Sequence, residues 1–216
     1  MMTMRNWPLF GLRLRTPRLE LRLPSPADLD ELASLAAAGV HEPAVQPFGV
    51  PWTDLPPGER ARSVVQFHWR QLGEWSPTDW TLNLVVDLGG VIAGTQGVSG
   101  RDFALVREAR TGSWLGQRFH RQGIGTEMRA AVLHLAFAGL EAEYATSNAF
   151  TDNAASLAVS RKLGYASDGI ERQVIRGRAA ARQRLRLDRA SWQAHRQTEV
   201  EITGLDGCRP DFGLPG

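Results

Sequence analysis

The stretch RFHRQGIGTEMRAAVLHLAF, residues 118–137, constrains the fold of this chain more than any other. It places basic side chains directly before a turn with two glycines, and the turn runs without a break into a helical segment that is apolar on most faces. A helix of that kind is buried against a sheet, so its first residues are held rigidly at the end of a strand. The stretch therefore predicts a mixed α and β domain with a fixed helix start.

The start of this helix is predicted to bind a phosphate or pyrophosphate. A helix N-terminus offers unpaired N–H groups and the positive end of the helix dipole. Glycine at 123 and 125 removes the Cβ atoms that would hold an anion away from the backbone. The predicted contacts are the N–H groups of Arg121, Gln122, Gly123, Ile124, Gly125 and Thr126, with charge added by the side chains of Arg118, His120 and Arg121. The alternative is that the glycines only shape a turn between a strand and a helix.

Two other nucleotide loops fit the same stretch poorly. A P-loop ends in Gly-Lys-Ser/Thr, whereas Gly125 is followed by Thr126 and Glu127. The dinucleotide-binding motif requires a third glycine where Met128 stands, although Glu143 lies about 20 residues on, where that motif has an acid. The residues before the loop, GSWLGQRF, are also too polar for the buried parallel strand of that motif. Nucleotide triphosphates and dinucleotides are therefore disfavoured as ligands.

The rest of the chain predicts one α+β domain with a mixed central sheet flanked by helices. We expect an arm at 1–15, the domain proper at 16–192, and a tail at 193–216 that packs on the domain or on a partner subunit. Strands are predicted at 18–24, 80–86, 91–99, 111–119, 143–150, 165–170 and 183–188. Helices are predicted at 26–39, 60–75, 124–137 and 153–163, and an ordered proline-rich loop at 41–59.

Composition removes several classes of function. The formal charge is only +2, so no general nucleic-acid surface is required. No apolar run reaches the length of a membrane span, and the first residues do not resemble a secretory signal, so a cytoplasmic protein without membrane contact is expected. The single cysteine, Cys208, lies in the tail and is interpreted as inert.

Two motifs resemble those of the GNAT acyltransferases. Gln122 to Glu127 is similar to the family's acyl-CoA pyrophosphate loop, and DNAASLAVSRKLGY, residues 152–165, resembles its next motif, in which Asn opens a helix that closes with Gly-Tyr. The pair Asn153 and Ser156 is similar to the Rim-type branch, which acetylates the N-termini of ribosomal proteins. The stretches WPLF, VPWT, GSWLG and GTEMRAAVL resemble an actinobacterial member of that branch that uses succinyl-CoA.

The resemblance implies an N-acyltransferase. Acetyl-CoA or succinyl-CoA would donate the acyl group, and a small molecule or a protein N-terminus would supply the amine, which attacks directly in a ternary complex without a metal. The backbone around Trp114 and Leu115 would pair with pantetheine, and an N–H of that strand would polarise the thioester carbonyl. Ser156 would donate to the departing thiolate, or bond within its own helical turn. Asn153 would contact the pantetheine arm, or only cap its helix.

The resemblance assigns no general base. Glu42, Asp54 and Asp102 are candidate bases by their place in loops, and a chain of water is the alternative. Glu127 is more simply a structural acid, and Ser160 stands where many family members carry a tyrosine acid. The hydrogen-bond donors expected for a succinyl carboxylate are Gln96, Ser99 and Arg101. Phe48 and Trp52 would line the acceptor site, or close the core.

Two other classes of function compete with the enzyme. The first is a catalytically silent domain that senses acyl-CoA or binds a protein, favoured by the missing base and tyrosine. The second is a nucleotide-dependent oxidoreductase. Seven tryptophans and an apolar tail also predict a homo-oligomer.

Overall fold

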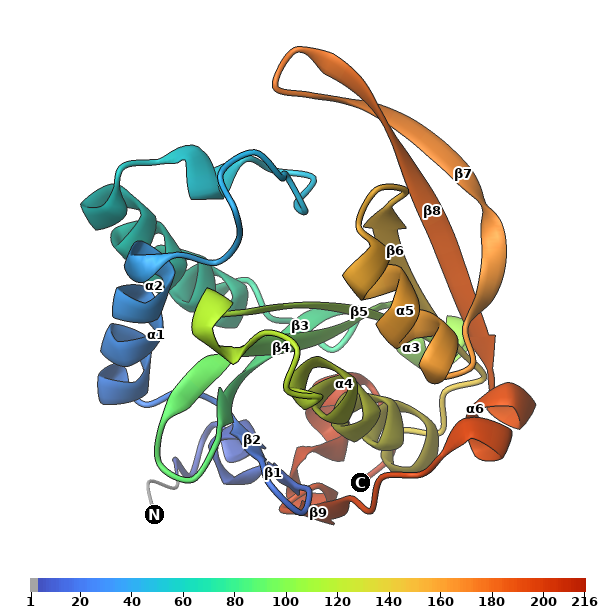
Figure 1. Ribbon diagram of the computed structural model, residues 1–216. Coiled ribbons are helices and arrows are strands. Elements are labelled where there is room, and N and C mark those ends of the chain that lie inside the picture. Colours follow the sequence, from blue (N-terminus) through green and yellow to red (C-terminus); the bar gives the residue numbers. More distant parts are fainter. Residues whose placement is uncertain (1–3) are drawn as a thin grey trace.

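A mixed sheet runs through the whole molecule in the computed structural model, which describes residues 4–216 (Figure 1). The strand order is β7-β8-β6-β5-β4-β3-β2-β1-β9, and all neighbours are antiparallel except β5 and β6. The predicted α+β class, with one domain and a mixed sheet, is confirmed. The strands are β1 (Arg13–Arg15), β2 (Glu20–Arg22), β3 (Asp79–Asp87), β4 (Ile92–Arg101), β5 (Glu108–Leu115), β6 (Tyr144–Phe150), β7 (Ala166–Ile175), β8 (Arg178–Asp188) and β9 (Glu201–Thr203).

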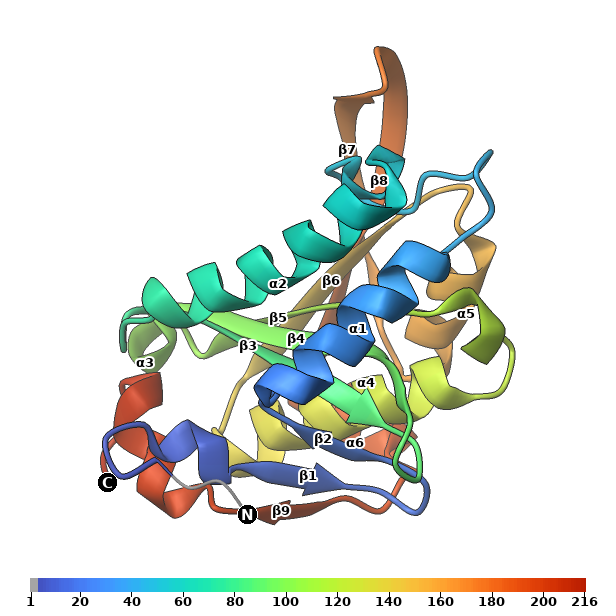
Figure 2. The ribbon, with the colours of Figure 1, turned by 90° about the vertical axis from the view of Figure 1, so that its left-hand side faces the viewer.

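Helices cover both faces of the sheet (Figure 2). On one face lie α1 (Pro26–Ala38) and α2 (Pro57–Gly73); on the other lie α4 (Ile124–His134), extended by a π-helical turn (Leu135–Gly139), and α5 (Ala154–Lys162). Side chains alternate between the two layers, so that Leu82 and Leu84 join the core under α4 whereas Val85 joins the core under α1 and α2. The remaining helical segments are α3 (Phe103–Val106), α6 (Arg189–His195) and short 3₁₀ turns at Pro8–Gly11, Trp52–Asp54, Gln117–Phe119 and Asp206–Phe212.

The helix starts follow from local chemistry. Ser25 and Asp28 form a reciprocal capping box, with Ser25 Oγ accepting from Asp28 N at 3.2 Å and Asp28 Oδ2 accepting from Ser25 N at 2.8 Å. Helix α2 begins at Pro57, three residues before the predicted start. Proline has the φ angle that the first helical turn needs and lacks only an N–H that would be unpaired there, so the proline pair begins the helix rather than blocking it.

Strands β7 and β8 form a hairpin much longer than the two short strands predicted. Its turn residues, Arg176 and Gly177, both have positive φ, 49° and 72°, as a two-residue hairpin turn requires. Most side chains of β7 are exposed, so the strand carries no apolar alternation for sequence analysis to detect. The prediction was wrong in length because it relied on that alternation.

Both ends of the described chain join the sheet. Strand β1 lies in the segment predicted as an irregular arm, of which residues 1–3 fall outside the described structure, and it pairs with β2 and with β9 of the tail. The apolar tail residues Cys208, Phe212 and Leu214 are buried, with Phe212 packed edge-on against Trp80. The tail therefore gives no support to the predicted homo-oligomer, which stays a prediction. No helix among residues 4–216 is long and apolar enough to cross a membrane.

Candidate active site

Strands β5 and β6 are parallel neighbours that separate after three residue pairs. Residues 108–110 of β5 pair with 144–146 of β6. Beyond them, β5 continues to pair only with β4, and β6 only with β8 (Figure 1). We call the opening between residues 111–115 and 147–150 the wedge. At its vertex, Ser147 Oγ donates a hydrogen bond to Thr111 O at 3.3 Å.

The inner edge of β5 presents backbone groups to the wedge. Gly116 N donates to Ala93 O at 2.9 Å, so the even-numbered residues of β5 direct their peptide groups toward β4. Ser113 therefore faces the wedge with both N–H and C=O, and Leu115 with its N–H, while the carbonyl of Leu115 is contacted by His120 Nε2. Of the two residues predicted there, Leu115 fits, whereas the peptide groups of Trp114 face β4. The side chain of Trp114 lies on the α1 and α2 face, 5.6 Å from the ring of Trp52.

The predicted anion loop follows directly from the end of β5. Among the described residues, the N–H groups of 121–125 have no hydrogen-bond acceptor, whereas Thr126 N donates to Gly123 O at 3.1 Å. Arg121 and Gly123 have positive φ, 61° and 79°, which turns successive N–H groups outward before α4 begins. Five of the six predicted N–H groups are thus free, and Thr126 is the exception.

Glycine at 125 is not required by the packing. A Cβ at this position would meet only Leu115 Cδ1 at 3.8 Å and Val159 Cγ2 at 4.0 Å, which is ordinary contact. Its φ angle is not positive, and glycine in a helix is less stable than alanine by about 0.5–1 kcal/mol. Neither packing nor backbone conformation within the described chain therefore explains why residue 125 is glycine.

Glu127 anchors the loop rather than taking part in proton transfer. Its carboxylate accepts hydrogen bonds from Thr16 Oγ1 at 2.6 Å and from Arg18 Nε at 2.7 Å. Arg18 also donates to Gln122 O at 3.0 Å. The interpretation of Glu127 as a structural acid is confirmed, and Arg18 neutralises its charge beside the free N–H groups.

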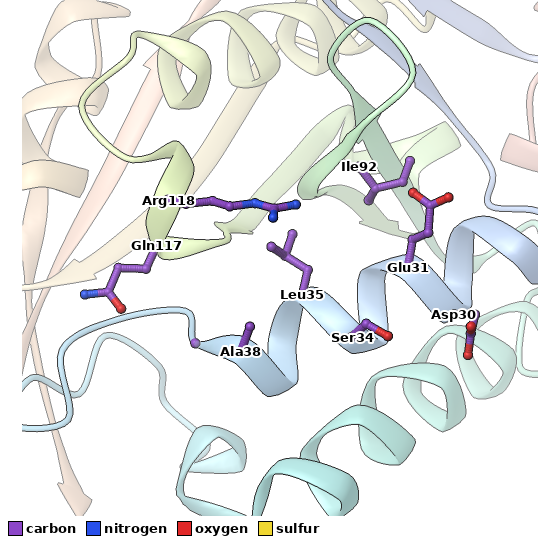
Figure 3. Close-up of a pocket in the computed structure, with 9 residues that line it drawn as sticks. Asp30, Glu31, Ser34, Leu35, Ala38, Ile92, Gln117 and Arg118 are labelled. Carbon is purple, nitrogen blue, oxygen red and sulfur yellow. The ribbon is translucent and has the colours of Figure 1, made fainter.

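The side chains next to the loop have other roles. His120 Nε2 lies 3.1 Å from Leu115 O, and Gln122 Nε2 donates to Arg118 O at 2.9 Å, so both brace the turn. The guanidinium of Arg118 packs on Phe119 at 4.8 Å and projects into a cavity of about 580 Å³ beside α1 (Figure 3). Residues 121–126 do not line that cavity. Arg118 therefore points away from the free N–H groups that it was predicted to assist.

A second cavity, of about 520 Å³, begins at the loop itself. Gly123, just before α4, forms one wall with Thr126 and Ala130 of the helix. Lys162 and Leu163 at the end of α5 form another, and Trp192 and residues 195–199 close the cavity. The cationic lining consists of Arg18, Lys162 and Arg196. Of its two carboxylates, Glu127 is already paired with Arg18, which leaves Glu199. The cavity is therefore an extension of the anion loop with a positive lining.

The first turn of α5 carries the two predicted catalytic residues. Asn153 caps the helix, since its Oδ1 accepts from Ser156 N at 3.1 Å, and this leaves Nδ2 for a second contact. The half-buried hydroxyl of Ser156 has no hydrogen-bond partner among residues 4–216. Helix α5 follows directly from the end of β6 that borders the wedge. Ser156 is thus a free hydroxyl beside the wedge.

Two other hydroxyls in this region, those of Ser160 and Tyr165, are engaged by protein groups. Ser160 is fully buried; its Oγ donates to Ser156 O at 3.0 Å and accepts from Arg129 at 2.9 Å. Tyr165 lies 3.2 Å from Thr111 Oγ1, and burial raises the pKa of its phenol. Neither is placed to give up a proton readily.

None of the three candidate bases is a free carboxylate beside the wedge. Glu42 accepts a hydrogen bond from Gln117 Nε2. Asp54 is bound by the guanidinium of Arg176, which lowers the pKa of its carboxyl and weakens it as a base. Asp102 lies in the turn between β4 and α3 with a left-handed backbone. None of the three is identified as the base by its contacts, and the base stays open.

An aromatic row lies on the α1 and α2 side of β5. The rings of His41, Phe48, Trp52 and Trp114 follow one another at 5.7, 5.2 and 5.6 Å. The last three pack against the core under α1 and α2 while staying partly exposed. The interpretation that Phe48 and Trp52 close the core is confirmed, whereas their role as walls of the acceptor site stays a prediction.

Comparisons with known proteins agree on one family. Residues 18–166 match the model of the acetyltransferase (GNAT) domain. The structure is similar to that of Mycobacterium smegmatis RimJ in complex with a CoA disulfide, with a TM-score of 0.69 and 16% identity over 89% of this chain and 98% of that one. It is also similar to RimL, a ribosomal L7/L12 α-N-protein acetyltransferase in complex with coenzyme A, with a TM-score of 0.64 and 19% identity. The match covers 80% of this chain and 95% of RimL. The structure of MccE, a microcin C7 self-immunity acetyltransferase in complex with acetyl-CoA and AMP, is similar with a TM-score of 0.61 and 16% identity. The match covers 80% of this chain and 93% of MccE.

Proposed function

Because the match spans more than half of its length, this chain belongs to the GNAT acetyltransferase family, and we propose that it is an acyl-CoA-dependent N-acyltransferase of the Rim type. The observation that carries this proposal is the continuity of two features. The wedge offers an unpaired strand edge, and the free N–H groups of 121–125 lie just beyond its open end. An extended chain that ends in a pyrophosphate matches both.

Coenzyme A has that shape. Its pyrophosphate would bind the N–H groups at the start of α4, where anions are favoured by the helix dipole. Its pantetheine arm carries amide groups that pair with Ser113 and Leu115 as an added strand does. Leu115 Cδ1 would lie only 3.8 Å from a Cβ at 125, so the strand edge and the anion loop are close enough for one ligand.

The cavity behind the loop suits the remaining end of the same molecule. The 3′-phosphate of coenzyme A lies on the ribose next to the pyrophosphate, and Lys162 and Arg196 line the cavity that begins at Gly123. Neither cation forms a salt bridge with a carboxylate in the described chain. We assign this cavity to the 3′-phosphoadenosine end.

The transfer itself needs little from the protein beyond position and hydrogen bonds. The amine attacks the thioester carbonyl, the C–N bond forms, and the C–S bond breaks. A wedge-facing N–H such as that of Ser113 would stabilise the developing oxyanion, a contribution of about 3 kcal/mol in comparable acyl transfers. The hydroxyl of Ser156 would hydrogen-bond to the departing thiolate and relay a proton to it.

Nucleophilic catalysis by cysteine plays no part in this proposal. Cys208 is fully buried, its Sγ lies 3.1 Å from Gly204 O, and burial raises the pKa of its thiol to about 11. Because no residue is assigned as the base, the acceptor amine would lose its proton to water. The acceptor is expected to be a primary amine, of a small molecule or a protein N-terminus, beside the aromatic row.

Thermal-shift titration with coenzyme A, acetyl-CoA and succinyl-CoA tests the proposal, followed by thiol release with a panel of primary amines. Stabilisation by all three and release of thiol are expected. If none of them raises the melting temperature, the proposal fails.

A silent acyl-CoA-sensing or protein-binding domain is the second candidate, because two of the three candidate bases, Glu42 and Asp54, are bound by Gln117 and Arg176. Stabilisation by the three coenzymes without thiol release from any amine would favour it.

A further inference from the structure

The β7–β8 hairpin meets the proline-rich loop after α1 at two places. Arg176 at the tip of the hairpin binds Asp54, and its Nη1 lies 3.5 Å from Pro43 O. Further along β8, Nη1 of Arg182 lies 3.0 Å from the position of a Cβ on Gly49. We call these two contacts the bridge; the hairpin leans toward the loop to make them (Figure 1).

Arg182 stands on the α1 and α2 face of the sheet, at the open end of the wedge. It pairs with Phe150, the last wedge residue of β6. Its guanidinium lies beside Gly49, which directly follows Phe48 of the aromatic row. The face is therefore the one on which Trp114 lies and on which the acceptor is expected.

The guanidinium of Arg182 is half-buried and has no carboxylate partner. Its Nη1 donates to Gln173 Oε1 at 3.0 Å, its Nε is buried without an acceptor among residues 4–216, and its Nη2 is not buried. Glu171 is opposite Arg182 in the strand register, but no salt bridge joins them. A cation that is partly removed from water attracts an anion with little screening by salt. Nη2 is the group that such an anion would contact.

The face around Arg182 carries further positive charge. Arg184 and Arg186 follow it at every second residue of β8, and Arg110 of β5 stands in the last residue pair before the wedge. Glu108 pairs with Arg186, whereas neither Arg110 nor Arg184 forms a salt bridge within residues 4–216. Because residues two apart on a strand share a face, these cations border the path from the bridge to the vertex of the wedge. The potential there favours an acceptor that carries negative charge.

The distance from the vertex to Arg182 selects the kind of acceptor. Phe150 is three residues along β6 from Ser147, about 10 Å at 3.3 Å per residue, and Arg182 is one strand spacing of about 4.8 Å further. The Cα of Arg182 is thus roughly 11 Å from the vertex, and its side chain points toward Gly49 rather than back along the strand. The carboxylate of a free α-amino acid lies within about 4 Å of its own amine, which is too short. In an extended peptide, at about 3.3 Å per residue, the side chain of the second or third residue reaches that far.

We propose that the acceptor is the N-terminus of a peptide chain with Asp or Glu as its second or third residue, and that Arg182 binds this carboxylate. The proposal rests on the proposed function, since it places the reacting amine at the vertex of the wedge. The bridge holds Arg182 in place through its contact with the loop. Arg182 is thus a specificity-determining residue for the acceptor, and the reaction is still attack of the amine on the thioester with release of the thiol.

The test is thiol release by the full chain from acetyl-CoA and from succinyl-CoA, with peptides that differ only by Asp, Asn or Lys at position 2 or 3. Free aspartate is the small-molecule arm. Arg182→Gln removes the charge, and Arg182→Glu reverses it. Arg172→Gln is the matched control, because this exposed arginine of β7 pairs with Ala181 and so lies on the opposite face of the same hairpin. The melting temperature of each variant shows that it is folded.

We expect the natural chain to use an Asp peptide with a kcat/KM at least tenfold above that of the matched Asn peptide, mainly through KM. Arg182→Gln should remove most of this ratio, Arg182→Glu should make the Lys peptide the better acceptor, and Arg172→Gln should keep the ratio. Those changes in preference would not follow from a merely structural role of Arg182.

Three results overturn the proposal: equal use of Asp and Asn peptides by the natural chain, an unchanged ratio in Arg182→Gln, or thiol release with free aspartate or other small amines but with no peptide. Each of them leaves the proposed function intact. Absence of thiol release with every amine would overturn both.

Discussion

The carboxylate of Asp54 receives two hydrogen bonds from the guanidinium of Arg176, with Arg176 Nε 2.8 Å from Oδ2. Asp54 ends the short 3₁₀ turn at Trp52–Asp54, and Arg176 is at the tip of the β7–β8 hairpin. The same guanidinium lies 3.5 Å from Pro43 O. One exposed ion pair thus connects the proline-rich loop after α1 to a hairpin on the far side of β6.

Removing this pair should loosen the loop without unfolding the protein. Exposed ion pairs contribute little to stability, so Arg176→Gln is expected to leave the melting temperature nearly unchanged. Cleavage by chymotrypsin at Phe48 and Trp52 should become several times faster, because the loop loses its distant anchor. Arg101→Gln, which breaks the exposed pair with Asp79, is the matched control and should not change cleavage there. Equal cleavage rates in all three proteins would show that the pair does not hold the loop.

Gly125→Ala should separate ligand binding from folding. The added methyl group has room and favours the helix, so the melting temperature without ligand should be unchanged or higher. It also shields the free N–H groups at the start of α4, so the Kd for coenzyme A should rise at least tenfold. Gly58→Ala, in the first turn of α2 with nothing near its Cβ, is the control and should bind normally. Normal affinity in Gly125→Ala would place the pyrophosphate elsewhere.

Substitutions in the first turn of α5 should distinguish capping from catalysis. Asn153→Ala is expected to lower stability by about 1 kcal/mol through loss of the cap, whereas Asn153→Ser keeps the cap. If Asn153 also contacts pantetheine, both variants should bind coenzyme A more weakly. Ser156→Ala should reduce kcat at least tenfold with little change in stability or in the affinity for coenzyme A. A Ser156→Ala enzyme with normal kcat would remove this residue from the proposed chemistry.

Lys162 should distinguish coenzyme A from dephospho-coenzyme A. Its ammonium lines the cavity behind the anion loop, so Lys162→Ala is expected to raise the Kd for coenzyme A by roughly threefold to tenfold. The Kd for dephospho-coenzyme A, which lacks the 3′-phosphate, should not change. An equal loss for the two ligands would show that Lys162 does not contact that phosphate.

His68 predicts a loss of stability in acid. It is 3% exposed in α2, and burial lowers the pKa of its imidazole from 6.5 to about 4. Between these values the unfolded chain binds a proton that the folded chain does not, so stability falls as the pH is lowered from about 6.5 to about 4. The loss from this residue approaches about 3 kcal/mol. Urea unfolding of His68→Phe at pH 7 and pH 4.5 should show a smaller difference between the two pH values than the natural chain does.

Sequence patterns predicted the elements that carry a strong local signal. The helix predicted at 26–39, the apolar helix from Ile124 and the hairpin between β3 and β4 lie where propensity, capping and burial agree. The β7–β8 hairpin was predicted too short because β7 is polar and exposed. Strands β1 and β9 are three residues each, and their pairing depends on segments nearly 190 residues apart, which no local pattern encodes.

The candidate site, like the fold, was predicted only where its signal is local in the sequence. The free N–H groups of 121–125 follow from glycine, basic residues and a helix start, all of which are adjacent in the sequence. The side chain of Arg118 points into the cavity beside α1, and Thr126 N is hydrogen-bonded to Gly123 O. Both depend on the three-dimensional course of the turn, so sequence analysis did not predict them.

The three residue pairs that join β5 to β6 have a mechanical consequence. Strands β9 to β5 form one half of the sheet and β6 to β8 the other, with only those pairs to bridge the backbone between them. A pantetheine arm lying along β5 would serve as an extra strand at this seam. Amide protons of Ser113 and Leu115 should then exchange with deuterium rapidly in the free protein and slowly once donor is bound, so that the substrate completes the architecture that acts on it.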